Sequence, residues 1–164
     1  MRILLDSNVL LRWNIRTTPQ SQLVIRAVDF LLASGALPCY TSQNLGEFWN
    51  VLTRPLDRNG FGLTPPEADR RARMIESQIP MLPDDPTVPL VWRRLLVAHA
   101  ISGVQVHDAR IAAAMSVHGV KRILTLNARD FARFPSIEAI HPEQVSRTAT
   151  GSTRISRKPP VATP

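Results

Sequence analysis

The chain has 164 residues, of which 44% are hydrophobic, and it carries a formal net charge of +7 at pH 7. This length suits one domain with a true apolar core, and the single cysteine, Cys39, excludes an internal disulfide framework and favours a reducing compartment. No apolar run approaches the about 20 residues of a membrane helix, so no membrane partner is expected, and the basic balance favours a polyanionic partner or substrate.

The amino terminus leads directly into an apolar run, Ile3–Leu5, which ends on Asp6. A run without alternation is typical of a strand covered on both faces. An acid just beyond such a strand lies where open α/β sheets form their ligand crevice, but Asp6 also suits the cap of a following helix. Because no charged segment and cleavage site precede the run, we expect a cytoplasmic protein.

Helices and strands are then expected to alternate along the chain. The expected elements are a helix over 17–32, a strand over 36–40, a helix from Thr41 or Ser42 to about Leu52, a capped helix starting at 64–67, an extended piece and loop over 80–89, a helix over 90–100, a helix over 106–119, a strand over 122–125, a loop with one helical turn over 126–134 and a strand over 137–140. This order predicts an α/β fold with a mainly parallel sheet.

Two further expectations follow from composition. Cys39 lies in the second predicted strand without an exposed electropositive neighbour, so a buried, structural thiol is favoured over a reactive one. From Ser146 onward polar and basic residues replace apolar ones. We therefore expect one domain over residues 1–145 and a disordered basic tail over 146–164.

Asp108 lies in the first turn of the most regular predicted helix. Ile111, Ala112 and Met115 follow it by three, four and seven positions, so helical geometry puts the carboxylate on the apolar, sheet-facing side. Burying a charge there is costly unless it is compensated. The alternative is an acid that favours the helix dipole, worth about 0.3–1 kcal/mol, and the spacing alone leaves both roles open.

The spacing around Glu47 predicts a side chain that points away from the core, unlike that of Asp108. The apolar side of its helix is formed by Leu45, Phe48, Trp49 and Leu52, and Glu47 points about 150° away from the centre of that side. Periodicity therefore predicts a solvated glutamate.

Other polar residues and motifs give weaker signals. Asn127 follows a predicted strand and Asp130 comes three residues later, where either side chain could serve a turn. His107 is expected to pack or to form local hydrogen bonds. The sequence has no glycine-rich phosphate loop, cysteine cluster or Gly-x-Ser-x-Gly segment, which excludes P-loop, zinc and hydrolase-triad chemistry.

Four segments, taken in order, resemble the PIN-domain family and, within it, the VapC-like ribonuclease toxins of bacterial toxin–antitoxin pairs. They are Ile3–Asn8, Glu47 within a helix, Val106–Ala109 and Leu124–Phe131. The resemblance extends over about residues 1–145. It implies a three-layer α/β/α sandwich whose acids converge at the carboxyl ends of the strands and hold Mg²⁺ or Mn²⁺.

The resemblance also assigns individual roles. Asp6, Glu47 and Asp108 match the family's first three acids, so the family pattern replaces the solvated interpretation of Glu47. Asn127 stands where the fourth acid is often found, so either Asn127 is a neutral ligand or Asp130 supplies the charge, and all five are candidate catalytic residues.

The expected supporting residues lie beside these acids. Ser7 and Thr125 would orient the carboxylates through their hydroxyl groups. Arg129 and Arg133, in the loop beside the expected cleft, are the candidate RNA-binding residues, whereas Arg110 lies on the helix flank opposite Asp108.

The chemistry of the acids favours the same metal. Three carboxylates that lie close together raise one another's pKa and cannot all stay ionised unaided. A divalent cation resolves this conflict, because Mg²⁺ binds carboxylate oxygens and keeps waters that can serve as nucleophiles.

The resulting hypothesis is a metal-dependent endoribonuclease that acts as a toxin, with an RNA substrate, a cognate antitoxin and a homodimeric state. Two alternatives stay open. One is a degenerate PIN domain that binds RNA or a partner without cleavage, motivated by Asn127. The other is phosphoryl transfer through an Asp6 nucleophile, which is weakened by Asn8, because the phosphatase pattern has a second aspartate there.

Overall fold

The computed structural model describes residues 1–17 and 19–145 of the chain. Its helices are α1 (Ser7–Asn14), α2 (Pro19–Ala33), α3 (Ser42–Thr53), α4 (Pro65–Glu76), α5 (Val88–Ala98) and α6 (Val106–Val117). Its strands are β1 (Arg2–Leu5), β2 (Leu37–Cys39), β3 (Arg122–Leu124) and β4 (Glu138–Ile140), and short 3₁₀ turns are η1 (Leu56–Arg58), η2 (Gly103–Gln105) and η3 (Ala128–Phe131). The tail predicted for residues 146–164 lies outside the described residues.

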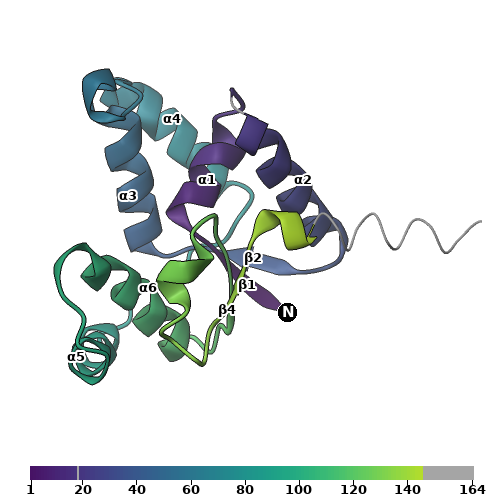
Figure 1. The fold of residues 1–164 in the computed structure, drawn as a ribbon. Coiled ribbons are helices and arrows are strands. Elements are labelled where there is room, and N and C mark those ends of the chain that lie inside the picture. Colours follow the sequence, from purple (N-terminus) through teal and green to yellow (C-terminus); the bar gives the residue numbers. More distant parts are fainter. Residues whose placement is uncertain (18, 146–164) are drawn as a thin grey trace, which may run out of the picture.

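The strands form one parallel sheet in the order β2-β1-β3-β4, with helices on both faces (Figure 1). Side chains of β1 alternate between these faces. Ile3 and Leu5 pack with residues of α1, α2, α3 and α4, while Leu4 packs with α6 and with partly buried residues of α5. This arrangement confirms the three-layer α/β/α fold with a parallel central sheet.

One helix was not predicted as a separate element. The eight-residue α1 begins directly after Asp6, which caps it by accepting a hydrogen bond from the backbone N–H of Ser7. Val9, Leu10 and Leu11 are buried along it. A helix this short is marginal in isolation, so its packing against α2 and α3 decides its conformation.

The predicted caps of α3 and α4 are both present. Thr41 is the N-cap of α3 and exchanges hydrogen bonds with Asn44, which decides between the two candidate caps. Thr64 and Glu67 form the expected capping box at the start of α4. These caps fix the starting points of two helices that pack on one face of the sheet.

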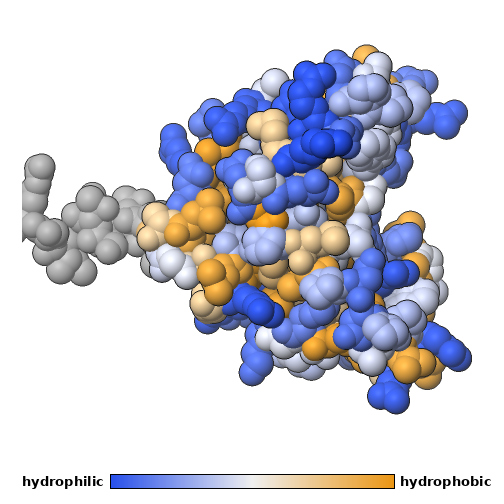
Figure 2. Space-filling view, turned by 180° about the vertical axis from the view of Figure 1, so that it is seen from behind, coloured by the Kyte–Doolittle hydropathy of each residue, from blue (hydrophilic) through white to orange (hydrophobic). Residues whose placement is uncertain are grey.

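Cys39 is only 3% exposed, and burial raises the pKa of its thiol to about 11. This confirms a buried, structural cysteine. Among residues 1–17 and 19–145, no helix combines the length and apolar character needed to cross a membrane. Seen from behind in Figure 2, the molecular outline is indented between the part built by α3 and α4 and the part built by α5 and α6.

Candidate functional site

Four elements bring acidic side chains to the carboxyl edge of the sheet. Asp6 follows β1, Glu47 lies in the middle of α3, Asp108 lies in the first turn of α6 and Asp130 lies in η3. The negative charges of Asp6, Glu47 and Asp130 all act on Asp108. The structure therefore gathers four of the predicted acids into one electrostatically coupled group.

Asp6 is the most firmly held of these acids. It is 6% exposed, and its Oδ2 accepts hydrogen bonds from Asn8 Nδ2 at 2.7 Å and from Thr125 Oγ1 at 2.6 Å. Burial raises the pKa of Asp6, against the hydrogen bonds from Thr125 and Ser7, and the charge of Glu47 raises it further. All of its hydrogen-bond donors are neutral, so its charge is oriented but not compensated.

The Ser7 hydroxyl links two of the acids but has a single proton to donate. Its oxygen lies 2.7 Å from Glu47 Oε2 and 3.3 Å from Asp6 Oδ1. The shorter contact identifies Glu47 as the acceptor. Among the described residues, the backbone N–H of Ser7 at 2.7 Å is then the one donor to Asp6 Oδ1, which leaves this oxygen one further lone pair.

Asn8 is a site residue that the sequence did not identify as such. Its Nδ2 donates to Asp6 and to Thr125 Oγ1, and its Oδ1 accepts from the backbone N–H of Leu126. Thr125 Oγ1 also accepts from the backbone N–H of Asn127 at 3.0 Å. The Asn8 side chain therefore joins the start of α1 to the chain that leaves β3 by hydrogen bonds.

Glu47 faces this group, and the periodicity-based prediction of a solvated side chain is wrong. Glu47 is half-buried, and besides Ser7 it accepts a hydrogen bond from Gln43 Nε2 at 2.8 Å. The same Gln43 nitrogen donates to the carbonyl of His107 at 2.9 Å. Helix α3 lies between neighbours on several sides, so a residue off its main apolar side still meets protein.

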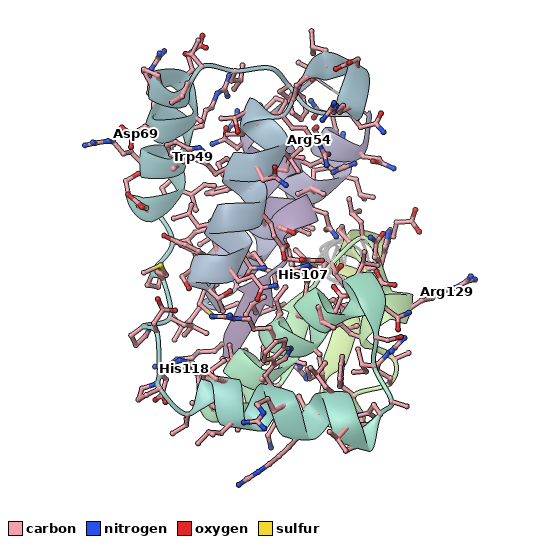
Figure 3. The ribbon with its side chains drawn as sticks, turned by 90° about the vertical axis from the view of Figure 1, so that its left-hand side faces the viewer. Trp49, Arg54, Asp69, His107, His118 and Arg129 are labelled. Atoms are coloured by element: carbon pink, nitrogen blue, oxygen red, sulfur yellow. The ribbon has the colours of Figure 1, made fainter. Side chains whose placement is uncertain are left out.

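His107 marks the junction between α3 and the beginning of α6 (Figure 3). Its side chain is exposed, and the local bond that it forms is made by its backbone carbonyl. His107 therefore contributes its backbone carbonyl to the site, and not its imidazole.

Asp108 lies in an unfavourable environment for a charged carboxylate. Burial, together with the charges of Asp130, Asp6 and Glu47 and against that of Arg133, raises its pKa to about 6. The guanidinium of Arg133 is also engaged, donating to Gln105 Oε1 at 2.7 Å. A carboxylate in this condition is stabilised by any cation that reaches it.

The two candidates for the fourth acid position differ from Asp6, Glu47 and Asp108 in their exposure. Asn127 and Asp130 are both exposed; Asn127 contacts the group through its backbone N–H, while Asp130 acts on Asp108 through its charge. Arg129 is exposed and extends away from the body of the protein (Figure 3). Of the two predicted RNA-binding arginines, Arg133 is thus the one that affects the acids directly.

The acids suit a hard divalent cation in donor type, since they offer carboxylate oxygens and Asp6 Oδ1 retains a lone pair. Within the described parts of the chain, no three Asp, Glu, His or Cys side chains converge closely enough to form a ready-made metal site. The residues present therefore fit such an ion in chemistry, with Asp6 and Asp108 as the buried and half-buried members of the set.

A family model described as the PIN domain matches residues 3–137 of the chain. A search of curated proteins finds no match. Three solved structures of similar fold illustrate the structural likeness.

A chain of DNA-bound VapBC from Salmonella typhimurium is 19% identical with a TM-score of 0.64, and the match covers 87% of this chain and 98% of that one. A chain of VapBC2 from Rickettsia felis, bound to a promoter DNA fragment, is 15% identical with a TM-score of 0.62 and coverages of 86% and 98%. VapC20 from Mycobacterium tuberculosis, a toxin that cleaves the Sarcin-Ricin loop, is 20% identical with a TM-score of 0.56 and coverages of 74% and 86%. At these identities the likeness establishes the fold.

Proposed function

The chain belongs to the PIN-domain family, and from that premise we propose that it is a metal-dependent endoribonuclease, the toxin of a toxin–antitoxin pair. The observation that carries the proposal is the environment of Asp108. Its pKa is raised to about 6 and three other acids act on it, an arrangement that costs stability and that a bound cation would relieve. The net charge of +7 supports an anionic substrate.

We propose that Asp6 and Asp108 bind a Mg²⁺ or Mn²⁺ ion, with Glu47 as the third acid. When bound, the ion supplies a polarised water and positive charge at the phosphodiester. Thr125 and Asn8 hold the Asp6 carboxylate in one orientation, and Ser7 and Gln43 hold Glu47. Asp130, or the amide of Asn127, would fill the fourth position at the exposed edge of the site, and Arg129 and Arg133 would bind RNA phosphates.

The test compares two variants that keep the shape of the acid but remove its charge, Asp6→Asn and Asp108→Asn. Because loss of a group that merely orients a ligand costs 10–100-fold, we expect each to lower Mg²⁺-dependent RNA cleavage by more than about 100-fold. Asp69→Asn is the matched control, since Asp69 pairs with Arg73 on the exposed side of α4. Undiminished cleavage by either site variant, or full activity in EDTA, would refute the proposal.

A cognate antitoxin and a homodimer belong to the same proposal. Membership in the family and the VapBC neighbours motivate them. The expected outcome is that an antitoxin co-expressed with the chain co-purifies with it and suppresses cleavage, and that light scattering gives twice the chain mass. A monomeric mass with full activity would contradict the dimer while leaving the nuclease proposal intact.

A second candidate function is RNA binding without cleavage. It is favoured by the amide at Asn127 and by the finding that no three metal-binding side chains converge in residues 1–17 and 19–145. RNA binding that is unaffected by Mg²⁺ and Mn²⁺, with no cleavage in either metal, would support this function over the nuclease.

A further inference from the structure

A pocket opens beside the acids on the side of α1 and α3. Its volume is about 340 Å³, near the lower end of the roughly 300–1,000 Å³ that small-molecule pockets span. Ser7, Asn8 and Glu47 line this pocket and also belong to the acidic site, so the two adjoin. A group bound there would lie next to whatever the acids bind.

The apolar part of the pocket lining is partly aromatic. It consists of Leu11, Ile15, Phe48, Val51 and Phe61. Phe48 is fully buried, whereas Phe61 is half-buried and is thus the aromatic residue that a ligand could reach. Such a surface suits a flat ring system, because a base can stack on an aromatic side chain whatever its sequence.

Two arginines, Arg12 and Arg54, also line the pocket. Arg12 donates to Gln20 Oε1 and to the carbonyl of Asn8, and Arg54 donates to the carbonyl of Asn59. The ion pairs of the described residues include neither arginine. Both positive charges therefore remain available to an anion at the mouth of the pocket.

Arg54 also has an unsatisfied hydrogen-bond donor. Its Nε is buried and has no hydrogen-bond partner in the described structure. Figure 3 shows Arg54 at the end of α3, on the side away from Trp49, which faces α4.

The loop that follows α3 keeps this arrangement in place. The backbone N–H of Phe61 donates to the carbonyl of Val51, which joins the loop to α3. A Cβ atom at Gly60 would overlap the carbonyl of Arg54, so glycine permits the close approach. Phe61 and Arg54 are thus held side by side at the same opening.

We propose that this pocket receives one nucleobase of the RNA next to the cleaved bond, with Arg12 and Arg54 binding the adjoining phosphates. The inference rests on the proposed function. Phe61, with two arginines that take part in none of the described ion pairs, matches the alternation of flat base and negative phosphate in a single strand. The pocket then gives the site a base preference that the four acids alone cannot provide.

The test measures binding of short, fluorescently labelled single-stranded oligoribonucleotides, each of one base type, to the cleavage-deficient Asp108→Asn chain with Mg²⁺ present. Phe61→Leu keeps an apolar side chain but removes the stacking ring, and Phe61→Ala removes both. We expect both to weaken binding about 5- to 100-fold and to reduce differences between the four base types. Leu56→Ala, at an exposed position of η1 outside the pocket, is the matched control with unchanged affinity.

The arginines are tested through salt dependence. Arg12→Gln and Arg54→Gln should each weaken binding and lower the slope of log affinity against log salt by about 0.7, the value for one phosphate contact on a single strand. Arg58→Gln is the control, because Arg58 is exposed in the neighbouring turn and does not line the pocket. Urea unfolding of every variant separates loss of folding from loss of binding.

The outcomes distinguish the pocket from the nuclease. RNA binding that is unchanged in all four pocket variants overturns the pocket proposal. The proposal is also overturned if the pocket variants bind RNA normally but are no longer inhibited by the antitoxin, because the pocket would then be a site for a peptide. Pocket-dependent binding by a chain that never cleaves RNA overturns only the nuclease function. Complete absence of RNA binding by the parent chain overturns both.

Discussion

Replacing Asp108 by asparagine should stabilise the metal-free protein at neutral pH. The carboxylate has a pKa of about 6 in the folded chain, against an ordinary value of 3.8. Well below its ordinary pKa the carboxyl is protonated in both the folded and the unfolded states and carries no penalty. As the pH rises from 3.8 through about 6, the unfolded chain ionises before the folded chain, so stability is lost, and the loss levels off above the folded pKa.

The size of the effect follows from this difference in pKa. The two values lie about two pH units apart, and each unit corresponds to about 1.4 kcal/mol, which sets an upper limit of about 3 kcal/mol. Asp108 is only half-buried, so solvent screening reduces this to about 1–1.5 kcal/mol. Asp108→Asn cannot acquire the charge and escapes the penalty.

The assay is urea unfolding of wild type and Asp108→Asn in EDTA at pH 4, 5, 6 and 7.5. We expect the difference in unfolding free energy between them to grow with pH in favour of the variant by about 1–1.5 kcal/mol. Asp57→Asn, exposed in η1, controls for the chemical change itself. Added Mg²⁺ should stabilise wild type more than the variant. A difference that does not change with pH would refute the electrostatic reasoning.

Three other substitutions separate positioning of the acids from general stability. Thr125→Val removes the hydroxyl that donates to Asp6. We therefore expect the unfolding free energy in urea titrations to fall by about 1–3 kcal/mol and cleavage to be lost, and a stable, active variant would contradict this. Gln43→Leu releases Glu47, which should lower the cleavage rate about 10–100-fold while urea unfolding stays nearly unchanged. Thr64→Ala breaks the capping box of α4 at a cost of about 1 kcal/mol, and cleavage per folded molecule should not change.

Position along the chain was sufficient to predict where Asp6 and Asp108 lie, although their roles in the site were indicated only by the family resemblance. The apolar run before Asp6 places it at a strand end, and three apolar residues at helical spacing place Asp108 toward the sheet. Both rules use only neighbours within about two helical turns or one strand. The structure agrees, since Asp6 is buried, Asp108 is half-buried and both belong to one coupled group.

Glu47, Asn8 and Gln43 could not be assigned from local spacing. The environment of Glu47 depends on helices that pack around α3, so single-helix periodicity predicted solvent, and only the family resemblance indicated the site. Asn8 reaches Thr125, 117 positions away, and Gln43 reaches His107, 64 positions away. Amides of this kind have no sequence signal of their own, because they act by closing hydrogen bonds between distant segments.

The balance of charge within the site connects its stability to its proposed chemistry. Asp6 is held by neutral donors from Ser7, Asn8 and Thr125, none of which offsets its charge. Among the described residues, Arg133 is the cation that lowers the pKa of Asp108, and it is shared with a glutamine. Because the fold orients these carboxylates without neutralising them, their repulsion is relieved either by a proton on Asp108 at low pH or by a cation, and under the proposed function a divalent ion would gain affinity from the repulsion that it removes.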